Sequence, residues 1–296
     1  MNILILGGLG FLGKNLSKEL SKRHDVFVVD VADIQEENYF KVNISEAGKI
    51  KKIIIENRIE VIIHLVSTLL PASEIDDFCK DVENVFVPTV QLVDFCAANS
   101  IKVVLFSSGG AVYGNLQNTF IEQTECKPIS FYGLSKLNLE NIIRFYHRTK
   151  KLNYIIIRPS NPYGYGQNIY GTQGLIAVII GKIIKGETLK ILGDGSAVKD
   201  YIFIDDFIFY VTCLLESNSF WNDTYNIGTG VGTSIEEVLV AFEGNGIRLP
   251  QIEFEEERQS DVNRMILDCS KIKQRFNHKC LSITDGIKLF WRQVNE

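Results

Sequence analysis

Short apolar runs rich in β-branched residues alternate with longer amphipathic segments over the first half of the chain. Several of the short runs are apolar at every position, which is typical of strands that are buried on both faces. In the longer segments the apolar residues recur every three or four positions, which predicts helices. The predicted strands cover residues 3–6, 25–29, 61–65, 102–106 and 154–157, and the predicted helices cover residues 12–22, 47–57, 83–99 and 135–150.

This alternation predicts an α/β fold, a Rossmann-type doubly wound parallel sheet with crossover helices on its faces. The rhythm changes after about Pro159, where glycine and tyrosine cluster in residues 161–167. We therefore expect a Rossmann domain at 1–165, with 195–230 partly returning to it, and a smaller α/β substrate-binding domain at 166–296. The smaller domain should sit at the carboxyl edge of the sheet, where such sheets bind ligands.

Charge and cysteine usage narrow the classes of function. The 31 basic and 36 acidic residues are spread along the chain without a basic block, so no nucleic-acid partner is expected. The six cysteines form no CxxC pair and no group with histidine at metal-ligand spacing, so we expect reduced thiols and no metal site. No charged leader or apolar run of 18 residues is present, so we expect a cytoplasmic protein with no membrane partner.

A glycine-rich loop follows the first predicted strand. Gly7, Gly10 and Gly13 have the spacing GxxGxxG, at the point where a dinucleotide pyrophosphate rests on a helix N-terminus. The alternative is a glycine-rich turn that binds nothing. Asp30 favours the first interpretation, because a carboxylate at the end of the second strand accepts hydrogen bonds from the adenine ribose and repels a 2′-phosphate. The expected cofactor is therefore NAD and not NADP.

A tyrosine and a lysine lie four residues apart in Tyr132-Gly-Leu-Ser-Lys136, on one face of a predicted helix start. The lysine charge favours phenolate, so we expect the pKa of Tyr132 to fall toward the working pH, as a general base requires. An isolated pair of this kind is common on exposed helix faces. Here it follows Phe106-Ser-Ser-Gly-Gly-Ala-Val-Tyr-Gly114, which gives it more weight.

With these motifs the chain resembles the extended short-chain dehydrogenase/reductase superfamily, in its NAD-dependent epimerase/dehydratase branch typified by UDP-glucose 4-epimerase. The resemblance covers nearly the whole chain. Asn84-Val-Phe-Val-Pro-Thr89 is similar to the family's NVxGT segment, with Pro88 in place of glycine. Further matching segments are His64-Leu-Val-Ser67, Arg158-Pro-Ser-Asn-Pro-Tyr-Gly164, Gly193-Asp-Gly-Ser196 on to Asp206, and Tyr225-Asn-Ile-Gly-Thr-Gly230.

The resemblance implies roles for particular residues. Tyr132 would be the catalytic base, Lys136 would hold the nicotinamide ribose and tune Tyr132, and Ser108 would supply a catalytic hydroxyl. The implied substrate-binding residues are Ser108, Asn161, Lys199 and Arg258. The implied cofactor-binding residues are Gly7, Gly10, Phe11, Leu12, Gly13, Asp30, Asn43, Ile44, Leu65, Val66, Ser67, Asn84, Ser107, Tyr132, Lys136 and Pro159.

Three departures from the family pattern bear on these roles. Gly109 stands where many members have the catalytic serine or threonine, so the neighbouring Ser108 is the candidate. Gly110 and Ala111 stand where dehydratases carry an acidic pair, which argues against 4,6-dehydration. Lys199 replaces the usual arginine, keeping the charge but losing the planar fork that binds diphosphate.

The function that these residues imply is a nucleotide-sugar 4-epimerase acting on a UDP-hexose or UDP-N-acetylhexosamine, in polysaccharide precursor synthesis. The alternatives are a nucleotide-sugar 4-ketoreductase of the same fold and a non-catalytic regulator that senses NAD. Met265 falls where the family's size-gating side chain sits, and ordinary core filling is its other interpretation. A homodimer formed through the helices predicted at 83–99 and 135–150 is expected from the family.

Overall fold

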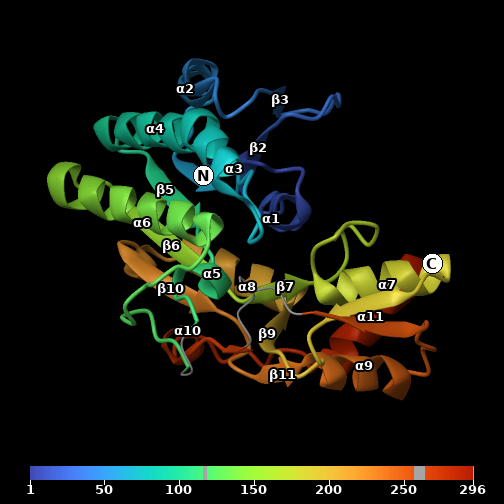
Figure 1. The fold of residues 1–296 in the computed structure, drawn as a ribbon. Coiled ribbons are helices and arrows are strands. Elements are labelled where there is room, and N and C mark those ends of the chain that lie inside the picture. Colours follow the sequence, from blue (N-terminus) through green and yellow to red (C-terminus); the bar gives the residue numbers. More distant parts are fainter. Residues whose placement is uncertain (116–118, 257–263, 296) are drawn as a thin grey trace.

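A computed structural model describes residues 1–115, 119–256 and 264–295 of the chain (Figure 1). Its central sheet has seven parallel strands in the order β10-β6-β5-β4-β1-β2-β3, so the strand order reverses beside β1. This arrangement confirms the predicted Rossmann-type fold. The strands are β1 (Asn2–Leu6), β2 (Asp25–Asp30), β3 (Tyr39–Lys41), β4 (Val61–His64), β5 (Lys102–Phe106), β6 (Tyr154–Pro159) and β10 (Asp223–Ile227).

Helices cover both faces of this sheet. Ile3 and Ile5 of β1 belong to one hydrophobic cluster, with α1 and α8, whereas Leu4 and Leu6 belong to a second cluster, with α2, α4 and α6. Alternate residues of a strand point to opposite faces, so the uninterrupted apolar run of β1 follows from burial on both sides. The helices are α1 (Phe11–Leu20), α2 (Ala47–Glu56), α3 (Ile75–Asp81), α4 (Val87–Ala98), α5 (Gly109–Val112), α6 (Phe131–Lys150) and α8 (Ile204–Glu216).

Helix α3 continues into α4 through a π-helix, η1 (Val82–Phe86). The segment at 84–89 is one residue longer than the NVxGT pattern, and a π-helix is how a helix absorbs one extra residue. Pro88 contributes, because it has no N–H to donate to the carbonyl of Asn84, four residues earlier. The helix predicted at 83–99 is therefore longer than expected and irregular in its first part.

The smaller part of the structure is built around β9. This strand pairs with β7, β11 and β13, and β8 pairs in parallel with β12. Strand β10 lies between these elements in sequence but belongs to the large sheet. The elements are β7 (Asn161–Tyr163), α7 (Leu175–Lys185), β8 (Leu189–Leu192), β9 (Val198–Phe203), η2 (Asn218–Phe220), β11 (Gly232–Ser234), α9 (Ile235–Gly244), β12 (Ile252–Glu255), β13 (Arg264–Met265), α10 (Ser270–Lys273) and α11 (Ile283–Asn295).

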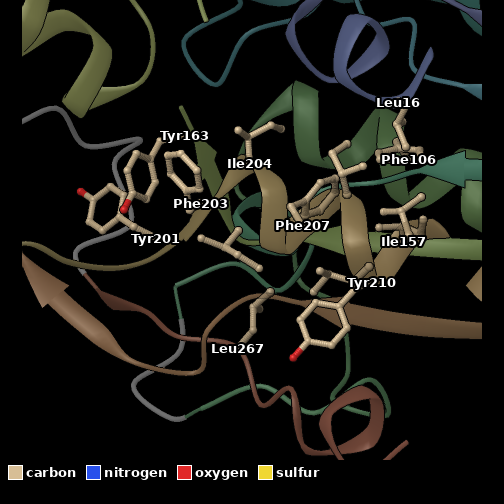
Figure 2. Close-up of a cluster of buried hydrophobic side chains, with 14 of the residues drawn as sticks. Leu16, Phe106, Ile157, Tyr163, Tyr201, Phe203, Ile204, Phe207, Tyr210 and Leu267 are labelled. Carbon is tan, nitrogen blue, oxygen red and sulfur yellow. The ribbon is translucent and has the colours of Figure 1, made fainter. Parts of the chain in front are cut away.

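One hydrophobic core joins the sheet to the smaller part (Figure 2). Phe207 of α8 lies 6.0 Å from Phe106, the last residue of β5, between ring centroids. From the same core Tyr163 reaches Phe203 of β9 at 5.6 Å. Because the core is continuous, it fixes the carboxyl edge of the sheet relative to β7 and β9. None of the helices in the described ranges is long and apolar enough to span a membrane.

Candidate active site

The three glycines of the first loop differ in why the structure accommodates only glycine or leaves open space there. Gly7 has φ +79°, which favours glycine, and a Cβ on Gly13 would lie 2.6 Å from the carbonyl oxygen of Gly7. A Cβ on Gly10 would meet nothing closer than 3.5 Å. The fold thus requires glycine at 7 and 13, whereas glycine at 10 leaves open space before α1, whose N-terminus has no side-chain cap. Open space beside free helix N–H groups suits a pyrophosphate.

Asp30 fixes the end of β2 to this loop. One carboxylate oxygen accepts a hydrogen bond from the Leu9 N–H at 2.9 Å, and the other accepts one from the Val31 N–H at 2.7 Å. The carboxylate therefore lies at a defined position on the wall of a cavity of about 590 Å³. Its charge disfavours a 2′-phosphate there.

That cavity collects most of the predicted cofactor residues and adds Thr68 and Val85, which the sequence did not suggest. Its volume and polar rim suit the adenosine and phosphate parts of a dinucleotide. Phe11, Leu12 and Gly13 form the first turn of α1, whereas Ser107 directly follows β5 and Pro159 ends β6. The predicted residues that line the cavity are Gly7, Gly10, Asp30, Asn43, Ile44, Leu65, Val66, Ser67 and Asn84.

Tyr132, Lys136 and Ser108 come together beside this cavity, since Lys136 contacts Val66 on its wall. Ser130 caps α6 by accepting the Gly133 N–H at 3.2 Å, which starts the helix so that Tyr132 and Lys136 share a face. The Lys136 Nζ lies 5.9 Å from the Tyr132 ring centroid and donates to the Val66 carbonyl at 3.4 Å. Ser108 shares a hydrogen bond with Tyr132.

The expected fall in the pKa of Tyr132 is wrong for this structure. Burial raises the pKa of Tyr132, and the hydrogen bond from Ser108 opposes the rise only in part. Burial also lowers the pKa of Lys136 to about 8, while Asp81 opposes that shift. A lysine with a pKa of about 8 is mostly protonated at pH 7, and burial dominates the pKa of Tyr132.

The structure explains why position 109 is glycine. A Cβ there would lie 2.7 Å from Leu267 Cδ1 and 2.9 Å from the Pro159 carbonyl oxygen. A Cβ on Gly110 would lie 3.3 Å from Met265 Cε. The segment at 265–267 thus occupies the room that larger side chains at 109 and 110 would need. The hydroxyl next to Tyr132 comes from Ser108, and Met265 is a buried side chain packed against Gly110.

The structure describes two of the three remaining predicted substrate residues, Asn161 and Lys199. Asn161 of β7 is half-buried and donates from Nδ2 to the Asp200 carbonyl at 2.9 Å. Lys199 of β9 is half-buried and stands in register with Met265, so it lies along the same wall. Arg258 lies outside the described residues.

One grouping that sequence spacing missed lies elsewhere. The side chains of Asp206, His278 and Cys280 offer ligand-type atoms within 4.8 Å of one another. His278 Nε2 is 2.6 Å from one Asp206 carboxylate oxygen, and the other accepts the Leu281 N–H at 2.9 Å. These contacts fasten the segment after α10 to α8, and we interpret them as structural.

Comparison with known proteins agrees with this geometry. A model of the NAD-dependent epimerase/dehydratase family matches residues 3–228. A dTDP-4-dehydro-6-deoxyglucose reductase of Escherichia coli is 30% identical over 96% of this chain and 95% of its own. A UDP-glucose 4-epimerase of Mycolicibacterium smegmatis is 30% identical over 93% of this chain and 92% of its own.

Solved structures give the same picture. The UDP-glucose 4-epimerase of Thermotoga maritima, crystallised with UDP-glucose, has a TM-score of 0.90 and 29% identity, and the match covers 100% of both chains. The UDP-glucose 4-epimerase of Thermus thermophilus, crystallised with NAD, has a TM-score of 0.90 and 26% identity over 100% of this chain and 99% of its own.

Proposed function

The chain belongs to the NAD-dependent epimerase/dehydratase family, and we propose that it is a 4-epimerase of a nucleotide-linked hexose. The observation that carries the proposal is the meeting of Ser108, Tyr132 and Lys136 beside the cavity that Asp30 and the open Gly10 loop line, with Lys136 bonded to Val66 on the cavity wall. The relatives from Mycolicibacterium smegmatis and Thermotoga maritima support it by their names.

Each residue has a task in this reaction. NAD, when bound along Asp30 and the Gly10 loop, would supply the hydride chemistry at C4 of the sugar. Tyr132, as phenolate, removes the proton from the sugar O4 and later gives it back. Ser108 donates to that phenolate oxygen or to O4, and Lys136 holds positive charge beside the phenol. Asn161, Lys199 and Arg258 hold the diphosphate while the ketose turns between the two hydride transfers.

Positions 110 and 111 lack the acid pair that 4,6-dehydration needs. Gly110 and Ala111 carry no acid, and Met265 closes over Gly110. A dehydratase needs one group to protonate the C6 hydroxyl and another to remove the C5 proton. Oxidation and reduction at C4 remain within reach of Tyr132.

A second function, 4-ketoreduction, is favoured by one observation, the similarity to the Escherichia coli reductase. Such an enzyme would consume a reduced cofactor in every turnover, whereas an epimerase regenerates its NAD. A reductase would use the same Ser108, Tyr132 and Lys136 to protonate the 4-keto oxygen. The net cofactor balance therefore separates the two.

The deciding experiment incubates the purified protein with UDP-glucose, UDP-galactose and their N-acetyl counterparts without added cofactor. Interconversion without net NADH formation supports the epimerase and identifies the preferred sugar. No interconversion, with NAD(P)H consumption on a dTDP-4-keto-6-deoxy sugar, assigns the reductase instead. A Tyr132→Phe protein that still converts substrate at the wild-type rate would contradict the role of Tyr132 in both reactions, whereas a protein that binds NAD but converts none of these substrates would favour a regulator.

The proposal also covers the substrate, the oligomeric state and the location of the protein. We infer a UDP-hexose or UDP-N-acetylhexosamine as substrate, with Met265 on the wall that senses the 2-substituent. We infer a homodimer through α4 and α6, on which Val87 and Phe145 are 44% and 48% exposed. A cytoplasmic location is part of the same proposal.

A further inference from the structure

A buried carboxylate stands behind the Tyr132–Lys136 pair. Asp81, the last residue of α3, is 3% exposed. One of its oxygens accepts the Thr68 hydroxyl at 2.6 Å, and the other accepts the Ser135 hydroxyl at 2.8 Å. Ser135 directly precedes Lys136, and Thr68 lines the cofactor cavity. Asp81 thus ties the loop after β4 to the first turns of α6.

The π-helix determines where Asp81 points. Asp81 and Thr89 are eight residues apart, which in a straight α-helix would put them about 80° apart around the axis. With one residue absorbed by η1, the separation falls to about 20°. Both side chains then face the same way: Thr89 bonds His64 at 2.9 Å, and Asp81 bonds Ser135.

The charges around Lys136 are unequal. Among the described residues, the titratable groups that act on it or lie against it are Asp81 from α3, His64 from β4 and Tyr132 on its own helix. Burial and the nearby Lys136 lower the pKa of His64 to about 3, so that imidazole is neutral. Burial lowers the pKa of Lys136 to about 8, and Asp81 works against this shift. Of these three groups, Asp81 is the one carboxylic acid, and it is the one that opposes the loss of the Lys136 charge.

We propose that Asp81 is a positioning residue that keeps Lys136 protonated and directed toward Tyr132, acting through Ser135 and Thr68. This inference rests on the proposed function. An ammonium that is buried without a counter-charge loses its proton, since desolvation disfavours the charged form. Without Asp81, Lys136 would lose its charge at a lower pH, and with it the means to stabilise a Tyr132 phenolate.

The first test is the pH profile of kcat for Asp81→Asn, with the exposed Asp76→Asn on the same helix as matched control. If Lys136 must be charged for turnover, as the proposal requires, its deprotonation sets the basic limb of the wild-type profile. We expect Asp81→Asn to move that limb down by about 1 to 3 pH units, and Asp76→Asn to leave it in place. Asp81→Glu should shift the basic limb less than Asp81→Asn does, because it keeps the negative charge. A basic limb that stays at the wild-type pH in Asp81→Asn overturns the proposal.

The second test does not need activity, so it stands even if the proposed function fails. The pKa of Lys136 is about 8 in the fold and 10.5 in the unfolded chain. Protonation of this lysine therefore destabilises the fold increasingly as pH falls from 10.5 to about 8, and by a constant amount below pH 8. In Asp81→Asn this loss should continue below pH 8. The gap in Tm between wild type and Asp81→Asn should therefore widen from pH 9 to pH 6.

The double variant Asp81→Asn/Lys136→Met completes the design. It removes both charges, so its Tm should not show that widening gap. If Asp81→Asn does not fold, the double variant should still be recovered folded, because the unpaired charge is gone. A double variant that is no more stable than Asp81→Asn, or a Tm gap that is the same at every pH, refutes the role of Asp81.

Discussion

Replacing Gly109 by serine would restore the hydroxyl that many family members carry at this position, and it should destabilise the protein. The new Cβ would stand 2.7 Å and 3.0 Å from the two methyl carbons of Leu267 and 2.9 Å from the Pro159 carbonyl oxygen. Leu267 is fully buried, so its side chain has little room to withdraw. The carbonyl belongs to the end of β6 and can move still less.

The size of the effect follows from these contacts. Overpacking of a filled core costs about 1 to 3 kcal/mol. The unfolding entropy of a chain of 296 residues is about 0.6 kcal/mol per kelvin, so Tm should fall by about 2 to 5 °C. Leu267→Ala alone should cost about 2 to 5 kcal/mol through the cavity it leaves. The double variant should lose about 1 kcal/mol less unfolding free energy than the two single variants lose in sum, because the clash with Leu267 is gone while that with Pro159 remains.

Urea unfolding of the four proteins measures this cycle. Gly48→Ser is the matched control, because a Cβ at the exposed Gly48 meets nothing within 4 Å. If the stability losses of Gly109→Ser and Leu267→Ala sum to that of the double variant within about 0.5 kcal/mol, the argument that Leu267 excludes a side chain at 109 is refuted. So would a Gly109→Ser protein as stable as wild type.

Three further predictions concern the site. Tyr132→Phe should lower the rate of epimerisation by about 10² to 10⁴ with an unchanged Tm, as read by product chromatography and calorimetry, and an active variant would contradict the base role. Gly10→Ala should weaken NAD binding in titration calorimetry without loss of stability, whereas Gly13→Ala should destabilise the fold, since its Cβ would meet backbone at 2.6 Å; equal stability losses would count against this distinction. The pKa of His64 is about 3 in the fold and 6.5 in the unfolded chain, so its contribution to stability is intact above pH 6.5 and lost as pH falls toward 3, at up to about 1.4 kcal/mol per pH unit. His64→Gln should therefore reduce the slope of unfolding free energy against pH in this range, as measured by urea unfolding. An unchanged slope would show that other groups cause it.

Local pattern predicted β1, β2, β4, β5 and β6 and the approximate positions of α1, α2, α4 and α6, because apolar periodicity reflects burial directly. It missed β3 and β10, and it predicted no individual element after residue 157. It also placed Gly7, Gly10, Asp30 and the Tyr132–Lys136 pair, whose spacing is set by one loop or one helical turn. It failed where distant segments meet. Neither Leu267 against Gly109 nor Asp81 against Ser135 can be derived from spacing, because each contact depends on how remote elements pack.

The pKa of Tyr132 was missed for a related reason. Sequence shows the lysine charge one turn away but not the burial of both groups, which dominates the balance. The cluster of Asp206, His278 and Cys280 was missed because α8 brings its acid from far along the chain. The one available signal for Asp81 was the extra residue in Asn84-Val-Phe-Val-Pro-Thr89, which marks a helix whose two halves are out of phase.

The π-helix also has a consequence for descent. A single inserted codon in this helix turns every residue before it by about 100° relative to those after it. An acid at position 81 is useful only on a chain that carries the insertion, and on a chain without it the same acid would face another neighbour. The contact of Asp81 with Ser135 therefore depends on the π-helix as much as on the acid itself.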